Sequence, residues 1–262
     1  MAGVTLTRND AERERLLRVL SATTFIIFFQ AYMVAPVIPA LANAFGISVE
    51  RAGLIVPAYL IPYGVATLLY GLLADRIGVH RLMFVSLAVF AALTLLTATA
   101  RSIDQLAMWR VLTGLGASGV VPLALTLVGR LYSYEQRGRP LGWLFGAMAG
   151  GMAFGSPLGA ILVPFIGWQG LFVVVGVAGG GLLLVLLPYR RFIAGTAQPV
   201  IGTLRDLFRG YRDLLGTPRA QRTYGFVFIN STFHSGVFTW LGVYLHQRYG
   251  VGPVGIGLAL LG

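Results

Sequence analysis

The sequence predicts an all-α integral membrane protein, and three observations support this prediction. Of the 262 residues, 56% are hydrophobic and only 11% are charged, and the mean hydropathy is +0.78. A soluble domain needs more charge than this to cover its surface. In addition, the apolar residues gather in stretches of the roughly 20 residues that a helix needs to cross a bilayer. The charged residues fall between these stretches.

The apolar stretches predict seven membrane-spanning helices and the beginning of an eighth. They occupy residues 19–42, 51–73, 82–100, 105–129, 140–163, 169–188 and 223–245. The eighth begins near Val254, and its residues up to Gly262 make about 14 Å of helix, short of the ~30 Å of a bilayer. We therefore expect an N-terminal tail at 1–18, a six-helix bundle at 19–188, a linker at 189–222 and the start of a second bundle at 223–262.

The first stretch ends in Ala40-Leu41-Ala42, a tripeptide that can mark the cleavage site of a signal peptide. Its apolar run is much longer than the roughly 7–15 residues of a signal peptide, and Pro36 and Pro39 interrupt it. We interpret it as a retained first span.

The charge pattern predicts the orientation of the helices. All 20 basic residues are arginine, and the formal net charge is +11. Only Arg51, Arg101 and Arg248 flank one side of the spans, while most other arginines lie on the opposite side. The positive-inside rule then places the N-terminal tail and the linker in the cytoplasm of a multi-pass protein of the cell (inner or plasma) membrane. Because the arginines follow the connections, we do not expect nucleic acid as a partner.

The linker contains one amphipathic segment. Its apolar residues recur at helical spacing and its arginines fall on the other side. The apolar residues are Leu204, Leu207, Phe208, Tyr211, Leu214 and Leu215, and the arginines are Arg205, Arg209 and Arg212. We expect a helix that lies on the inner leaflet with its arginines toward anionic headgroups. The alternative is a solvated linker helix without membrane contact.

The connection between the second and third spans reads Gly71-Leu72-Leu73-Ala74-Asp75-Arg76-Ile77-Gly78-Val79-His80-Arg81. It resembles the signature G-x-x-x-D-R-x-G-x-R/K-R/K of the major facilitator superfamily. The matches are Gly71, Asp75, Arg76, Gly78 and Arg81, with a departure at His80. The resemblance implies two six-helix bundles of 3+3 inverted repeats, of which this chain carries the first bundle, the linker and an incomplete second bundle. It also implies that Asp75 is a conformational latch on the cytoplasmic side. From the residues alone, the two arginines are also ordinary topology determinants.

A short repeat in the sequence fits this architecture. Ser48-Val49-Glu50-Arg51-Ala52-Gly53 follows the first span, and Ser133-Tyr134-Glu135-Gln136-Arg137-Gly138 follows the fourth. Both read as a helix cap and first turn. Their three-span separation is typical of two units of opposite orientation.

The fourth span contains Leu106-Ala107-Met108-Trp109-Arg110-Val111-Leu112-Thr113-Gly114-Leu115-Gly116-Ala117-Ser118. This resembles the family pattern L-x-x-x-R-x-x-Q-G-x-G-A-A, with Thr113 in place of Gln. Arg110 lies inside the span, so its guanidinium must face a polar cavity or a partner. Because arginine stays protonated, it can hold an anionic group or bias a carboxylate but cannot carry a proton. The alternative is that Arg110 reaches the outer interface, although Gly114 and Gly116 indicate a protein-facing surface.

The fifth span carries Gly142, Gly151, Gly155, Pro157 and Gly159. The spacing resembles the antiporter signature G-x8-G-x3-G-P-x2-G-G, with the proline displaced by one residue and Ala160 in the last position. The resemblance implies efflux by antiport. From the residues alone, the same glycines also fit plain packing of small residues between helices.

Candidate substrate contacts are the polar, aromatic and methionine residues near the bilayer midplane. They are Gln30, Tyr32, Tyr59, Tyr63, Thr113, Met148, Met152, Asn230 and His234. His234 is a candidate proton acceptor or a neutral histidine bonded to a neighbouring helix. None of the nine acids lies mid-span, which favours neutral or anionic substrates over cations.

The sequence and the resemblance together predict a secondary transporter that exports a small molecule by alternating access, with protons as the coupling ion. The alternatives are an uptake carrier for a sugar, anion or metabolite, and a non-transporting fragment, because the second bundle is required for alternating access. A seven-helix receptor or retinal protein fits less well, since the N-terminal tail is basic and the chain has no lysine. We find no pattern for an enzyme, a cofactor or a metal site, and expect the lipid bilayer and a small-molecule substrate as partners.

Overall fold

The computed structural model describes residues 8–195, 204–252, 255–256 and 259, and every element in these ranges is helical. The first crossing combines α1 (Arg8–Tyr32), η1 (Ala35–Val37) and α2 (Ile38–Phe45). The next elements are α3 (Val49–Gly53), α4 (Ile55–Ile77), α5 (Val79–Thr97), α6 (Ile103–Ala117), α7 (Val120–Leu131) and η2 (Tyr134–Gln136). They are followed by α8 (Gly138–Leu186), η3 (Leu187–Tyr189), α9 (Arg190–Ala194), α10 (Leu204–Leu215) and α11 (Pro218–Tyr249).

Five helical stretches among the described residues are long and apolar enough to cross a membrane. They are Asp10–Phe45, Val49–Gly71, Val79–Thr97, Ile103–Leu131 and Gly138–Ala194. The last of them turns back at Gly167, whose φ of 68° and ψ of 171° break the helix inside α8. This stretch therefore supplies both the fifth and the sixth predicted spans. The seventh predicted span coincides with α11, which is not among the five and stays a prediction.

Part of the expected tail at 1–18 is helical in the structure. Residues 8–18 are helical and continuous with the first span. Leu16, Leu17 and Leu20 are buried in the main hydrophobic core. These leucines recur at helical spacing, so the same apolar face that packs inside the bilayer continues toward the N-terminus. The expected boundary at residue 18 is therefore not a boundary of the helix.

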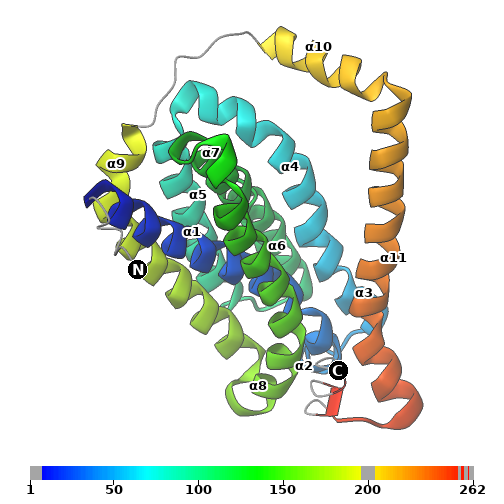
Figure 1. Cartoon of the computed structure of the whole chain (residues 1–262). Helices are drawn as coiled ribbons and strands as arrows, with labels where there is room; N and C mark the ends of the chain where they lie inside the picture. The colour runs from blue at the N-terminus through cyan, green and yellow to red at the C-terminus, as the bar shows by residue number, and fades with distance from the viewer. Residues whose placement is uncertain (1–7, 196–203, 253–254, 257–258, 260–262) are drawn as a thin grey trace, which may run out of the picture.

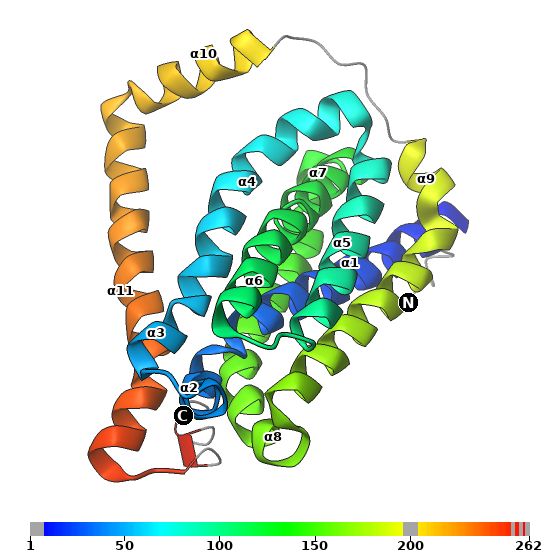
Figure 2. The same ribbon diagram turned by 180° about the vertical axis from the view of Figure 1, so that it is seen from behind.

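The first part of the expected linker also packs against the bundle. The short helix α9 continues the sixth crossing beyond its predicted end at residue 188, and its Ile193 is 1% exposed. It contacts α5. The predicted amphipathic helix is present as α10, which lies apart from the bundle (Figures 1 and 2). Its described side chains, including Arg209, Arg212 and Leu215, are exposed, and its contact with a membrane stays a prediction.

Two helix pairs form the centre of the bundle. The first half of α8 packs along α1, and α6 packs along α4. We call the end of the bundle where α1 and α5 begin the proximal end, and the end with the Gly167 turn the distal end. In Figures 1 and 2, α11 runs along the side of α4 and approaches the bundle near α2 and α3, at the distal end.

Candidate functional site

The α1/α8 interface is built by the glycines that the sequence singles out in the fifth span. A Cβ atom on Gly151 would lie 2.5 Å from the Phe25 carbonyl oxygen, and one on Gly155 would lie 2.8 Å from that of Phe29. A Cβ on Gly159 would meet the Met33 backbone even more closely. Only glycine allows the two backbones to approach this far. Gly151, Gly155 and Gly159 therefore form a close-packed face of α8 against α1.

The other two members of that pattern differ. Gly142 is exposed, and a Cβ atom there would meet nothing within 4 Å. Pro157 is buried inside α8. Its neighbour Ser156 donates a hydrogen bond of 3.0 Å to the Tyr32 carbonyl oxygen, which ties α8 to α1 at this level.

The α4/α6 interface holds the arginine of the fourth span. Arg110 is 0% exposed, and its Nε donates to the Ile55 carbonyl oxygen at 3.4 Å. The guanidinium carbon lies 4.3 Å from the centroid of the Tyr59 ring, a cation–π contact. Nη1 and Nη2 are buried and find no hydrogen-bond partner among the described residues. Arg110 therefore faces protein and not the outer interface.

The glycines and the threonine of this span pack within the bundle. A Cβ atom on Gly114 would collide with the Tyr59 carbonyl oxygen, and one on Gly116 with the Val89 side chain. Thr113 is buried, and its hydroxyl donates 2.7 Å back to the Trp109 carbonyl oxygen of its own helix. The hydroxyl is thus tied to the backbone at the position where the family pattern has glutamine.

Two of the predicted contact residues, Tyr59 and Tyr63, come together in an aromatic row with Phe28, which the sequence did not single out. The rings of Tyr59 and Tyr63 stack with centroids 5.7 Å apart. Tyr63 meets Phe28 of α1 edge to face at 6.4 Å. Tyr59 is buried, whereas Tyr63 and Phe28 are half-buried. The row therefore leads from the Arg110 guanidinium to accessible surface.

The remaining candidates are dispersed. Gln30 is 0% exposed, and neither end of its amide has a partner among the described residues. Tyr32 of α1 and the α8 methionines Met148 and Met152 are half-buried. Asn230 lies on an exposed part of α11, where that helix stands away from the bundle. The side chain of His234 lies outside the described part of the chain.

α11 contacts the first bundle at the distal end. A Cβ atom on Gly53 would lie 2.9 Å from the Trp240 ring, and one on Gly242 would lie 3.6 Å from Cα of Pro36. Val243 is buried. A groove of about 680 Å³ lies between α4 and α11; it begins at the Gly53/Trp240 contact and extends toward the proximal end. It is lined by Leu60, Ile61 and Gly64 on one side and Phe228, Ser231 and Thr232 on the other.

This arrangement of helices has known counterparts. The sequence model of the Major Facilitator Superfamily matches residues 20–262. The chain belongs to this superfamily. The crystal structure of a bacterial homologue of the human lysosomal transporter Spinster, in an inward-facing and unoccupied conformation, has a TM-score of 0.76 at 18% identity. The matched region covers 95% of this chain and 58% of the Spinster homologue. The match confirms the predicted fold.

Two curated superfamily members are similar in sequence. The putative multidrug resistance protein MdtD of Klebsiella pneumoniae (strain 342) is 30% identical over 154 residues, which is 58% of this chain and 33% of the relative. The 4-hydroxybenzoate transporter PcaK of Acinetobacter baylyi is 31% identical over 183 residues, which is 68% of this chain and 40% of the relative. Even the relatives that match most of this chain are covered over only about 60% of their length. Superfamily members are multi-pass membrane transporters and not enzymes.

The superfamily signature at residues 71–81 lies at the proximal turn between α4 and α5. Gly78 ends α4 with a φ of 93°, a conformation that favours glycine. Arg76 and Arg81 are exposed, and a Cβ atom on Gly71 would meet nothing within 4 Å. The side chain of Asp75 lies outside the described part of the chain, so its role as a latch stays a prediction.

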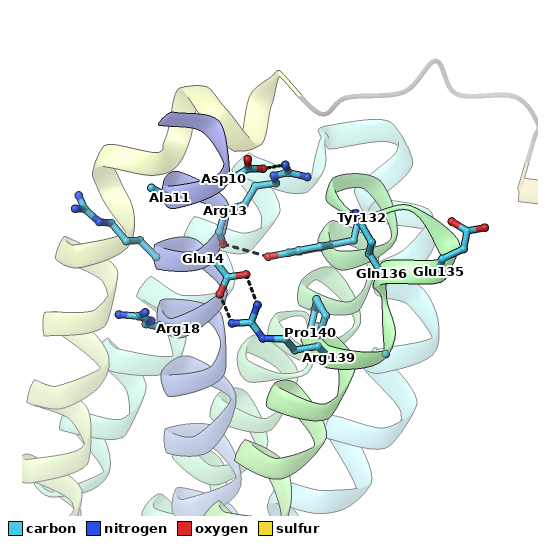
Figure 3. A pocket seen from close by; sticks show the side chains of 12 residues that line it. Asp10, Ala11, Arg13, Glu14, Arg18, Tyr132, Glu135, Gln136, Arg139 and Pro140 are labelled. Atoms are coloured by element: carbon cyan, nitrogen blue, oxygen red, sulfur yellow. Dashed lines mark hydrogen bonds and ion pairs between the residues drawn. The ribbon is translucent and has the colours of Figure 1, made fainter. Parts of the chain in front are cut away.

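Two ion pairs, which sequence reasoning did not find, join the ends of the two central helix pairs. They lie at opposite ends of the bundle. At the proximal end, Arg139 of α8 forms a bidentate pair with Glu14 of α1, with distances of 2.7 and 3.1 Å (Figure 3). At the distal end, Arg51 of α3 pairs with Asp104 of α6 at 3.1 Å. Each pair joins the start of one span to the start of another. The positions are more than 50 residues apart in sequence, so no local spacing could have indicated them.

The proximal pair borders a charged pocket of about 750 Å³ between α1 and the α7/α8 connection (Figure 3). Arg13 pairs with Asp10 and donates to the Leu131 carbonyl oxygen at 3.1 Å. The Tyr132 hydroxyl donates to the Arg13 carbonyl oxygen at 3.4 Å. Burial is the main cause that raises the pKa of Tyr132, and the nearby Glu14 carboxylate raises it further. This phenol therefore stays neutral. The pocket lies at the proximal end of the bundle, and its lining also includes the charged residues Arg15, Arg18 and Glu135.

Proposed function

We propose that the chain is the N-terminal part of a secondary transporter that exports a small molecule by alternating access, driven by proton antiport. The observation that carries the proposal is the one-ended contact between α11 and the first bundle. Trp240 and Gly242 touch Gly53 and Pro36 at the distal end, whereas the groove between α4 and α11 lies open further toward the proximal end. A helix held at one end only is poised to rock against its neighbour.

The efflux direction rests on two supports. The fifth span has the glycine spacing of the antiporter signature, and the chain is 30% identical to a putative multidrug resistance protein over 154 residues. For the proton, His234 is the titratable group of this chain that lies inside a predicted span. The second bundle that full-length relatives carry is the other place for a proton-carrying carboxylate.

The orientation of the chain in the membrane and the role of Asp75 as a latch follow from the same proposal. Arg51, Arg101 and Arg248 lie at the distal end, and the more numerous remaining arginines at chain ends and connections lie mostly at the proximal end, which we therefore place in the cytoplasm. Asp75 then lies at the cytoplasmic end of α4, where it would latch the first bundle to the second when the proximal side closes. The open groove corresponds to a state that faces the cytoplasm.

A second candidate is the uptake of an organic anion, and Arg110 favours it. A buried cation without a carboxylate beside it suits an anionic cargo, and PcaK, named a 4-hydroxybenzoate transporter, is 31% identical over 183 residues. Because the chain spans about 60% of full-length relatives, we expect the 262-residue chain alone to transport nothing. Substrate-dependent flux in vesicles that contain only this chain would overturn that expectation.

Cysteine cross-linking tests the rocking mechanism directly, because the chain has no cysteine of its own. The variant Gly53→Cys/Trp240→Cys joins the distal contact, and Leu60→Cys/Phe228→Cys spans the open groove. In the resting state we expect a short bifunctional reagent to link the distal pair efficiently and the groove pair poorly. In a chain extended through the second bundle, a proton gradient or substrate should reverse this order. Cross-linking that stays the same at both places under every condition contradicts alternating access.

A further inference from the structure

Arg110 is the most anomalous side chain in the described part of the protein. It is fully buried, its Nε alone has an acceptor, and Nη1 and Nη2 have none among the described residues. A guanidinium offers five donors and stays protonated. A buried cation is costly unless it is paired and hydrogen-bonded. The buried Arg110 therefore lowers the stability of the protein, and packing elsewhere in the fold must offset this cost.

Among the acids whose side chains the structure describes, none forms an ion pair with Arg110. The acids of the chain are Asp10, Glu12, Glu14, Glu50, Asp75, Asp104, Glu135, Asp206 and Asp213, and each lies at or near the end of a span or in a connection. Asp10, Glu14 and Asp104 are engaged by arginines at the ends of the bundle. Arg110 thus has no counter-charge among the described side chains, and a bound anion is one group that could supply it.

The surroundings of Arg110 are aromatic. The Tyr59 ring covers the guanidinium at 4.3 Å, and Tyr63 and Phe28 continue the row toward accessible surface at 5.7 and 6.4 Å. The Tyr59 hydroxyl is buried and has no partner among the described residues. Tyr59 thus stands between the buried cation and the half-buried end of the row. It occupies the place that a flat aromatic ligand would take over the guanidinium.

We propose that Arg110, Tyr59 and Tyr63 form the recognition site for a small aromatic monocarboxylate. This inference rests on the proposed transport function and names its substrate class. The two carboxylate oxygens accept from Nη1 and Nη2, a fork geometry that arginine matches and lysine does not. The ligand ring stacks beside Tyr63 after Tyr59 turns away. Without ligand, Tyr59 returns and shields the cation.

Binding to the 262-residue chain in lipid nanodiscs tests the proposal, with isothermal titration of benzoate and of its neutral isostere benzamide. We expect benzoate to bind about tenfold or more tightly, because the site offers charge-assisted hydrogen bonds that benzamide cannot use fully. Arg110→Gln should abolish this preference, and Arg110→Lys should retain a weakened preference. Arg101→Gln, an exposed arginine near the start of the same span, is the matched control and should bind as the wild type does.

Two results would overturn the proposal: equal binding of benzoate and benzamide to the wild type, or an undiminished benzoate preference in Arg110→Gln. If that variant does not fold, the comparison of the two ligands on the wild type still decides. Tyr59→Ala provides a second measurement, since loss of the covering ring should speed benzoate association. The titration needs no flux, so its outcome is independent of the transport assay. Benzoate binding through Arg110 without transport in any extended chain would remove the proposed function alone.

Discussion

The α1/α8 and α4/α6 interfaces are two versions of one helix pair, and they differ in what they bury. In both, glycines of one helix lie against the backbone of the other, and an ion pair closes one end, proximal for α1/α8 and distal for α4/α6. This relation is expected of inverted repeats. Yet α1/α8 is joined by glycines and one serine hydrogen bond, whereas α4/α6 encloses a guanidinium with two unpaired nitrogens.

The difference indicates that the two interfaces have different roles in the first bundle. An interface of small residues gains close backbone packing without burying a charge, so α1/α8 is suited to hold the bundle rigid. An interface with a buried cation sacrifices stability, and such features concentrate where a protein binds or moves something. We therefore expect a bulky substitution in α1/α8 to lower stability. Removal of the cation from α4/α6 should raise stability and impair function.

The largest effect is expected from Gly159→Leu in the α1/α8 interface. A side chain there collides with the Met33 backbone, which cannot turn aside as a flexible side chain can. We expect a loss of about 3 kcal/mol or more of unfolding free energy, at the upper end of overpacking effects, measured by denaturant titration in detergent micelles. Gly142→Leu is the control, because that position faces open space, and it should change stability by less than about 0.5 kcal/mol. Similar losses in both variants would contradict the packing role.

The second effect has the opposite sign. Arg110→Met replaces the buried cation by an apolar side chain of similar length, and we expect the unfolding free energy to rise by about 1–3 kcal/mol. The same variant should lose its preference for benzoate. Arg101→Met, at an exposed position, should alter stability by no more than about 0.5 kcal/mol. A strong destabilisation by Arg110→Met would mean that the guanidinium holds the bundle together, and the contrast between the two interfaces would disappear.

The sequence predicted the fold well where the signal is local. Apolar stretches located the spans and placed the end of the fifth at residue 163 and the start of the sixth at 169, because membrane thickness acts within a short segment; the structure turns between them at Gly167. The glycine spacing of the fifth span likewise predicted a packed face. The sequence could not assign Tyr59 as the cover of Arg110, since the two residues are far apart along the chain and no spacing rule joins them. Asn230 is exposed on α11, and its contact with a substrate stays a prediction.

The smallest effects should come from the two closing ion pairs, and they should differ. Glu14 has only 19% of its side chain exposed and binds Arg139 through two hydrogen bonds. Arg51 and Asp104 are 56% and 78% exposed. Solvent and salt screen the exposed pair more strongly.

We therefore expect Arg139→Gln to lower the unfolding free energy by about 1 kcal/mol and Arg51→Gln by only a few tenths, roughly. A double-mutant cycle with Glu14→Gln or Asp104→Asn isolates each pair from other effects of the arginines. Raising the salt concentration should reduce the smaller coupling first. Equal coupling energies at both ends would show that burial of Glu14 adds nothing, and that the inverted repeats are closed by equivalent contacts. A larger coupling for Arg139 would instead make the proximal end of α1/α8 the firmer of the two, as a rigid pair beside a rocking helix requires.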